Sequence, residues 1–230
     1  MVSALGETLT YAIGLALSPF AVTTGIVFLL GDRGRTKAAL FGLGWFAALA
    51  VITTVAMLVV DSVDDDYPEQ TADGIDIIAL VFAALFFALA VVAWMKRPSS
   101  TTAEASKSAS GKGGLLDRLD GFSLVGAVGL GLAQGFLVVK NIPLGVSAGA
   151  ALGSAGLNTA ESAVAVAIFA FLATLGVVVP LAAAVLGGQR INPALAQARA
   201  WIDTNMTAIT ITVLLILGAY FLGQGLRLTA

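Results

Sequence analysis

The chain has 230 residues, of which 58% are hydrophobic and only 11% charged, and its formal net charge is −2. A soluble domain carries about 25% charged residues, so this composition, with a mean hydropathy of +0.96, excludes a soluble globular domain and predicts an integral membrane protein. Cysteine and histidine are both absent, which excludes disulfides, haem ligation and most zinc sites. We therefore expect no metal and no cofactor, and the acidic balance argues against a nucleic-acid partner.

Uncharged stretches long enough to cross a membrane recur along the chain. A transmembrane helix needs roughly 20 apolar residues. Such stretches lie at 8–31, 38–60, 77–95, 121–160 (interrupted only by Lys140), 162–189 and 204–226. We predict an all-α integral membrane protein with six transmembrane helices. The first residues lack the basic region of a cleaved signal peptide, so we expect the first span to be retained.

The basic residues predict the orientation of these spans. Ten of the twelve Lys and Arg residues fall within 32–37, 96–120 and 190–203, whereas 61–76 holds seven acidic residues and no basic one. Basic loops stay in the cytoplasm, which predicts a multi-pass protein of the inner (cytoplasmic) membrane with both termini outside. A seventh span, made by turning the chain at Lys140, would move 190–203 outside and weaken this bias.

The six spans divide into two groups of three. We expect a first three-helix repeat at 1–95, a cytoplasmic linker rich in Ser, Thr, Ala and Gly at 96–120, and a second repeat at 121–230. Because each group has an odd number of spans, the two would form an inverted repeat. The first span of each group has a central proline, in "ALSPFAV" (16–22) and "VKNIPLGV" (139–146). Proline removes a backbone donor, and matched broken spans typically mark a transporter's binding site, so we predict that spans 1 and 4 are broken there.

Lys140 is the strongest candidate for a functional residue. It has 19 uncharged residues before it and 20 after it, and no Asp or Glu lies inside any predicted span. An ionisable residue within the membrane is a functional-site hypothesis by default, and an unpaired cation favours an anionic guest. Snorkelling of the side chain to an interface is the alternative.

Other polar residues and prolines flank the two predicted breaks. We expect substrate binding to involve Lys140 together with Ser18, Pro19, Thr23, Thr24, Gln134, Asn141 and Pro143. Helix capping and hydrogen bonding between helices are the alternatives for the polar members of this set. Arg33 and Arg35 serve either as cytoplasmic anchors or to capture an anionic lipid headgroup.

Glycines recur every fourth residue on both sides of Pro143, at 131 and 135 and at 145, 149 and 153. This spacing lets helix backbones approach closely. It predicts tight packing between helices and also allows a homodimer.

Two blocks of the sequence resemble a known family. "IGLALSPFAVTTGIVFLLGDRGRTKAALFGLGWFAAL" (13–49) and "GLAQGFLVVKNIPLGVSAGAAL" (131–152) resemble the GAP/Sap family, the glycopeptidolipid- and sulfolipid-addressing proteins of the lysine exporter (LysE) superfamily. The resemblance implies six spans in an inverted three-helix repeat. The superfamily's Ser-Pro signature falls on Ser18 and Pro19, and its cluster of Asn, Pro and Lys falls on Lys140, Asn141 and Pro143.

Two departures from the superfamily pattern weigh against amino-acid export. The order here is Lys-Asn-Ile-Pro rather than Asn-Pro-Lys, and Phe20 and Ala21 stand where a second proline is typical. The family is associated with envelope lipids and glycolipids, which fits an anion site at Lys140.

These observations together predict a membrane transporter, a flippase or exporter, of a lipid or glycolipid with an anionic headgroup. The headgroup would be bound between spans 1 and 4 with Lys140 as its counter-charge. A small-solute exporter of the LysE type and a non-transporting accessory protein of a lipid-export machine are the alternatives. We do not expect an enzyme, because only Lys140 and hydroxyl groups are left within the membrane for catalysis.

Overall fold

A computed structural model describes residues 1–62, 76–96 and 122–226. These residues are helical and include no strand, as predicted. The helices are α1 (Val2–Ala16), α2 (Pro19–Leu30), α3 (Gly34–Ser62), α4 (Ile77–Met95), α7 (Leu124–Leu137), α8 (Asn141–Gly153), α9 (Thr159–Ala173), α10 (Leu175–Gly187), the 3-10 turn η2 (Gly188–Ile191) and α11 (Asn192–Gly225). The predicted linker beyond Lys96 and most of the acidic segment 61–76 lie outside the described residues.

Polar residues at the boundaries of the apolar stretches fix where several helices begin. The Asp76 carboxylate accepts a hydrogen bond from the Ala79 N–H at 2.9 Å at the start of α4. Asn158 and Glu161 form a capping box at the start of α9. Such caps satisfy N–H groups that have no partner within the helix.

The lengths of the helices agree with a membrane protein. Three helical stretches of the described chain are long and apolar enough to cross a membrane: Gly34–Val60, Ile77–Met95 and Leu175–Gly225. The bent pairs α1–α2 and α7–α8 raise the number to five if each pair counts as one crossing.

The predicted fifth span, 162–189, is not one helix. It divides at Thr174 between α9, which has 15 residues, and α10. The Thr174 hydroxyl donates a hydrogen bond to the Ala170 carbonyl at 2.7 Å, and this kind of bond between a side chain and the preceding turn commonly bends helices. Hydropathy gives no sign of a break at Thr174, because an uncharged Thr inside an apolar run changes it little. The proline of this span, Pro180, would be expected to kink the helix, but it lies six residues further on, inside α10.

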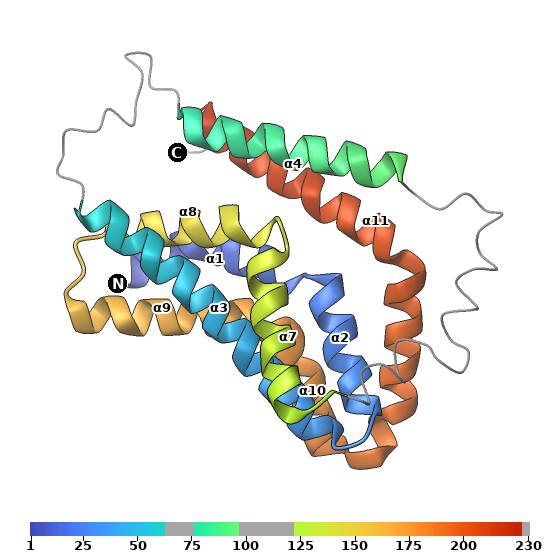
Figure 1. Cartoon of the computed structure of the whole chain (residues 1–230). Coiled ribbons are helices and arrows are strands. Elements are labelled where there is room, and N and C mark those ends of the chain that lie inside the picture. Colours follow the sequence, from blue (N-terminus) through green and yellow to red (C-terminus); the bar gives the residue numbers. More distant parts are fainter. Residues whose placement is uncertain (63–75, 97–121, 227–230) are drawn as a thin grey trace.

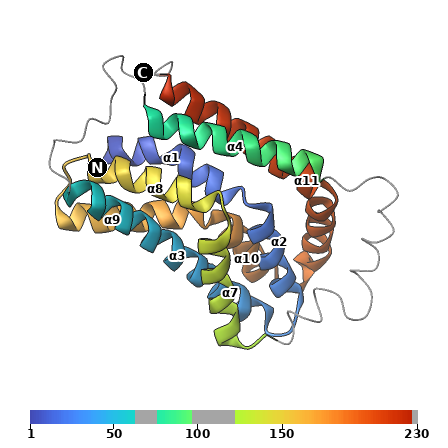
Figure 2. The same ribbon diagram turned by 45° about the horizontal axis from the view of Figure 1, so that its top comes forward.

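Each of the two bent pairs, α1–α2 and α7–α8, packs against other helices. Helix α3 lies along α7 and α8, while α1 contacts α8 and α9, and α2 contacts α10 and α11. Figures 1 and 2 show α1 and α8 side by side, and α4 running along α11. The place where α1 meets α8 therefore lies between both bent pairs.

Glycines let the backbone of α3 touch those of α7 and α8. We call this contact the glycine seam, and it is formed by Gly44, Gly131, Gly135, Gly145, Gly149 and Gly153. A Cβ atom on Gly131 would collide with the Phe41 carbonyl oxygen, and one on Gly149 with that of Thr53. The close packing expected from the glycine spacing is thus confirmed.

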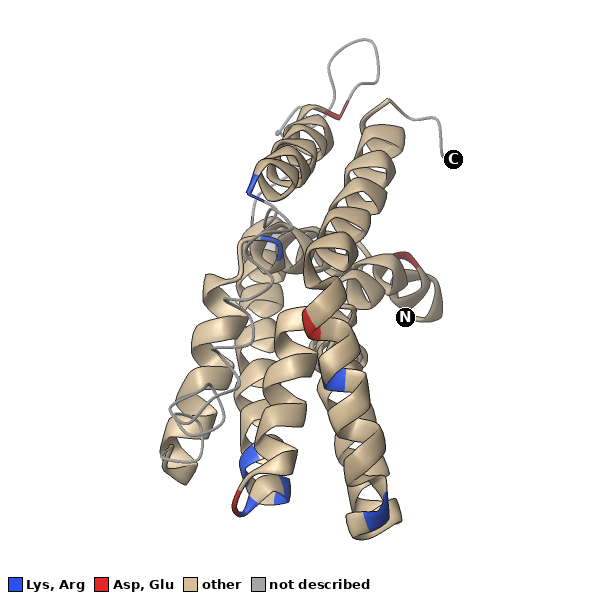
Figure 3. Ribbon diagram, turned by 90° about the vertical axis from the view of Figure 1, so that its right-hand side faces the viewer, with Lys and Arg blue, Asp and Glu red and all other residues tan. Residues whose placement is uncertain are grey.

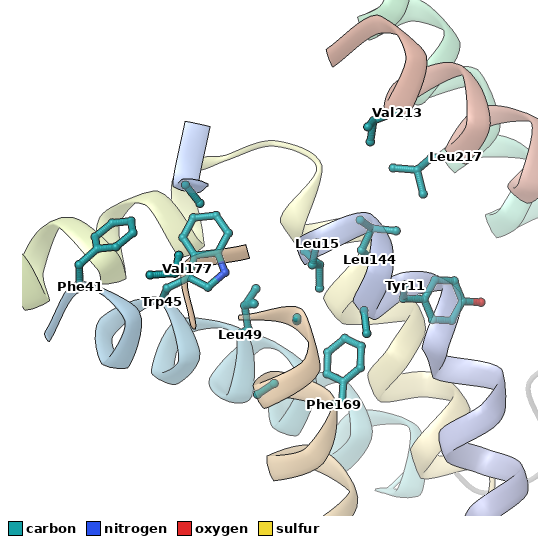
Figure 4. Close-up of a cluster of buried hydrophobic side chains, with 14 of the residues drawn as sticks. Tyr11, Leu15, Phe41, Trp45, Leu49, Leu144, Phe169, Val177, Val213 and Leu217 are labelled. Atoms are coloured by element: carbon teal, nitrogen blue, oxygen red, sulfur yellow. The ribbon is translucent and has the colours of Figure 1, made fainter. Parts of the chain in front are cut away.

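The main core lies between the same helices. Figure 4 shows Leu15 of α1 next to Leu144 of α8, with Leu217 of α11 nearby. All three side chains are buried. The core therefore includes residues of both bent pairs.

Candidate functional site at the two helix breaks

Both predicted breaks are present, one on each side of the site. Helices α1 and α2 meet at an angle of 58°, and α7 and α8 meet at 77°. Pro19 is the first residue of α2 and Pro143 is the third of α8. The prolines therefore lie in the first turn of the second helix of each pair, where a missing N–H costs little.

The first break is set by the Ser18-Pro19 step. A residue that precedes proline is pushed toward extended backbone, and Ser18 has φ −85° and ψ 104°. Ser18 is buried, but its side chain makes no capping hydrogen bond. The backbone turns at this residue, and the first N–H groups of α2 face the break.

The second break is closed by Asn141. Its Nδ2 atom donates to the carbonyl oxygens of Gly135 at 2.9 Å and Gln134 at 3.3 Å. Both carbonyls belong to the last turn of α7. That of Gln134 also accepts from the Val138 N–H at 3.2 Å, while that of Gly135 lies where helix geometry leaves acceptors without a helical partner. Asn141 has 0% exposure, so its amide stabilises the bend from within the protein.

Lys140 joins the two breaks. Its Nζ atom donates a hydrogen bond to the Gly14 carbonyl oxygen in the last turn of α1 at 2.7 Å, and the residue is 9% exposed. No carboxylate among the described residues lies within ion-pair distance of this ammonium. An ammonium has three donors, so two remain for a guest.

Gln134 connects the second bent pair to the first. Its Nε2 atom donates to the Thr24 hydroxyl at 3.1 Å, and that hydroxyl donates to the Phe20 carbonyl at 2.9 Å. The bonds of Asn141 and Gln134 agree with the alternative for these two residues, hydrogen bonding between helices, and they do not test a role in binding.

Several buried polar atoms near the breaks have no hydrogen-bond partner within the described chain. They are Oε1 of Gln134, Oδ1 of Asn141 and the hydroxyls of Thr23 and Thr53. Leaving such a group unsatisfied costs about 1–3 kcal/mol. Their oxygens would accept hydrogen bonds from a bound molecule that carries hydroxyl groups.

Arg33 and Arg35 lie away from this cluster. They follow the C-terminal end of α2, whose 12 residues separate them from the break by about 18 Å. Figure 3 shows basic residues gathered at the lower end of the molecule, where the α2–α3 turn lies near η2. Both arginines are exposed and are not part of the cluster around Lys140.

The sequence analysis missed two members of the site. The Gly14 carbonyl is a backbone group 126 residues away from Lys140, and no side-chain pattern marks it. Thr53 lies on α3 near Gly145 and reads in the sequence as an ordinary span residue. In the sequence, the two prolines and the isolated lysine were the features that indicated where the site lies.

The chemical groups of the site are one buried ammonium together with amide and hydroxyl groups. No group of three or more His, Cys, Asp or Glu among the described residues could hold a metal ion.

Comparison with known proteins gives one match. The model of the family described as "Sap, sulfolipid-1-addressing protein" matches residues 8–227. No match was found among curated proteins or among solved structures. The match includes every residue of the site, the whole of the α7–α8 pair and all of the α1–α2 pair from Thr8 onward.

Proposed function

The chain belongs to the Sap family of sulfolipid-1-addressing proteins, and we propose that it is a transporter, a flippase or exporter, of a lipid or glycolipid with an anionic headgroup. The family is one of lipid-addressing membrane proteins and is not a known enzyme family. The observation that carries the proposal is the buried Lys140, whose Nζ atom donates to the Gly14 carbonyl and has no carboxylate of the described residues within ion-pair distance.

Lys140 would act as the counter-charge of the headgroup. Burying an ion costs several kcal/mol unless it is paired, and the Gly14 carbonyl is a neutral partner. A phosphate, sulfate or carboxylate would pair with the ammonium and recover part of this cost. The N-terminal ends of α2 and α8 also carry partial positive charge, which favours the same kind of guest.

The unpartnered oxygens of Gln134 and Asn141 would bind the uncharged part of the headgroup. Hydroxyl groups of a sugar are suitable donors to both, and the Thr23 hydroxyl offers a further polar contact. Ser18, Thr24 and the two prolines would shape the site by holding the breaks open. Arg33 and Arg35 would collect the anionic lipid at the cytoplasmic surface, about one helix length from the breaks.

We further propose six spans in an inverted repeat in the inner membrane, with both termini outside. The packing supports two related halves, since α7 and α8 lie against α3 while α1 and α2 lie against α9 and α10. In this arrangement α9 and α10 together form the fifth crossing, and α11 forms the sixth. The two bent pairs would be the corresponding first spans of each half.

Native mass spectrometry of the detergent-purified protein tests this proposal. We expect wild type to retain an anionic lipid or glycolipid that Lys140→Ala loses. The matched control is Lys96→Ala, because Lys96 is an exposed lysine at the end of α4, and it should retain the lipid. Equal retention by wild type and Lys140→Ala would overturn the role of Lys140.

Transport is tested separately in reconstituted vesicles with a fluorescent anionic lipid whose outer-leaflet fraction is bleached chemically. We expect wild type to expose nearly all of the label to bleaching and Lys140→Ala to leave the inner-leaflet fraction protected. Transport of amino acids without lipid movement would favour the small-solute alternative. Lipid binding without transport, together with a stably co-purifying partner, would favour the accessory role.

A further inference from the structure

A second candidate site lies away from the helix breaks. A cavity of about 450 Å³ lies between α3, α8 and α9. On α8 it is lined by Leu152 and Gly153, in the last turn of that helix. Lys140 precedes the first turn, so the cavity lies about 18 Å from it along the helix axis. The two sites are therefore distinct.

The cavity is elongated and uncharged. Its lining runs along α3 from Phe46 to Leu58 and along α9 from Thr159 to Ala167. These lengths correspond to about 18 Å and about 12 Å of helix. No Asp, Glu, Lys or Arg lines it, so its shape and chemistry fit a hydrocarbon chain better than a charged headgroup.

The two ends of the cavity differ in polarity. Thr159 and Ser162 contribute hydroxyls beside the α8–α9 turn, whereas Phe46, Val166 and Ala167 make the other end apolar. Hydroxyls at one end suit the ester or hydroxyl group that begins a lipid chain. The apolar end suits the methylene groups that follow.

The position of the cavity favours an occupant that comes from the lipid bilayer. The lining residues of α3 lie within the membrane-crossing stretch Gly34–Val60, and Leu58 at the cavity edge is 55% exposed. In the bilayer this surface faces lipid. Apart from the hydroxyl residues Thr54, Thr159 and Ser162, the lining is apolar. Apolar surface that is left empty loses dispersion contacts, so a lipid chain is a suitable occupant.

We propose that this cavity binds one acyl chain of a membrane lipid, with the polar start of the chain at Thr159 and Ser162. The chain would belong to a lipid other than the one bound at Lys140, because Thr159 and Ser162 lie beside the α8–α9 turn, at the opposite end of α8 from Lys140. The inference therefore goes beyond the proposed function and adds a tail site that is separate from the headgroup site at Lys140.

Photocrosslinking in vesicles tests the inference on the full chain. The probe is phosphatidylcholine with a diazirine in one acyl chain, and labelled peptides are located by mass spectrometry. We expect labels to concentrate on α3 and α9 residues that line the cavity. Labels spread evenly over the exposed faces of α4 and α11 would overturn the proposal, whatever the behaviour of any variant.

A pair of neighbouring substitutions sharpens the test. Ala163→Phe places a ring in the cavity lining and should reduce cavity labelling about tenfold. Val164→Phe adds the same ring next to it, at a position that is 48% exposed and outside the lining, and should label like wild type. Unchanged labelling of Ala163→Phe would contradict the proposal.

Lys140→Ala separates this inference from the proposed function. If the cavity binds a chain independently, Lys140→Ala keeps the cavity labels even where it loses the retained anionic lipid. Retention of the anionic lipid by wild type without any cavity labelling would overturn the tail site and leave the headgroup site standing.

Discussion

Lys140 and Gly14 are 126 residues apart in the chain, yet the lysine Nζ atom donates to the glycine carbonyl at 2.7 Å. This carbonyl lies in the last turn of α1, where acceptors lack helical partners and carry partial negative charge. The bond therefore satisfies a backbone group and holds a cation at the end of a helix. A bound anion has to compete only with one neutral oxygen for this cation.

Replacing Lys140 by Met should abolish transport while leaving the fold intact. Loss of a buried charge contact costs about 2–5 kcal/mol, so we expect lipid movement in vesicles to fall roughly 30-fold or more. The free energy of unfolding should be unchanged or raised, because relief of the desolvation cost, several kcal/mol, outweighs the loss of one hydrogen bond. Lys96→Met is the control and should move lipid like wild type. A Lys140→Met protein that unfolds more easily and transports normally would show that the lysine is only a structural link.

Replacing Asn141 by Ala should destabilise the protein. The change removes the side-chain donor to the Gly135 carbonyl and one of the two donors to the Gln134 carbonyl, which keeps the Val138 N–H. We expect a loss of about 1–3 kcal/mol in the free energy of unfolding. Asn205 is a matched control, since its Nδ2 atom also donates to a helix carbonyl, that of Trp201 at 2.8 Å, but in an exposed setting. Asn205→Ala should cost about 0.5 kcal/mol or less. Equal costs in titrations with a denaturing detergent would contradict the assigned role of Asn141.

Adding one methyl group to the glycine seam should separate α3 from α7. A Cβ atom on Gly131 meets the backbone of Phe41 and Trp45, whereas one on Gly129 has no atom within 4 Å. We expect Gly131→Ala to lose about 1–3 kcal/mol in the free energy of unfolding. Gly129→Ala, on the same helix, should be neutral or slightly stabilising. Similar unfolding curves for the two variants would rule out a backbone contact at Gly131.

Single cysteines can test the proposed orientation, because the natural chain has none. Thr36 lies just after the α2–α3 turn and Ser154 just after α8, and both are exposed. We expect a membrane-impermeant maleimide to label Ser154→Cys in intact cells and Thr36→Cys only after the membrane is opened. Labelling of both from the same side would contradict the proposed arrangement of spans.

The bends of the candidate site could be predicted from sequence because their causes are local. Pro19 and Pro143 impose backbone restrictions on their own neighbours, and both bends occur beside them. The isolation of Lys140 was equally visible, since its nearest charged neighbours in sequence are about 20 residues away.

Other features could not be predicted, because they depend on distant groups or on one of several local alternatives. The partner of Lys140 is a main-chain oxygen, which has no signature in the sequence. The break at Thr174 depends on a hydroxyl that bonds to the preceding turn, a choice that threonine makes in some helices and not in others. The cavity between α3, α8 and α9 depends on how three separate helices leave space, which no single segment encodes.

The glycine seam also has a consequence for genetic variation. Every missense change at a glycine codon adds a side chain, and at Gly44, Gly131 and Gly149 even a single carbon collides with the backbone of the facing helix. We therefore expect almost every substitution at these three glycines to be depleted from a saturation-mutagenesis library. The outward face of α4, with exposed Val81 and Val91, should accept most apolar replacements. In a map of mutational tolerance, the least tolerant positions would follow the contact between the backbone of α3 and those of α7 and α8.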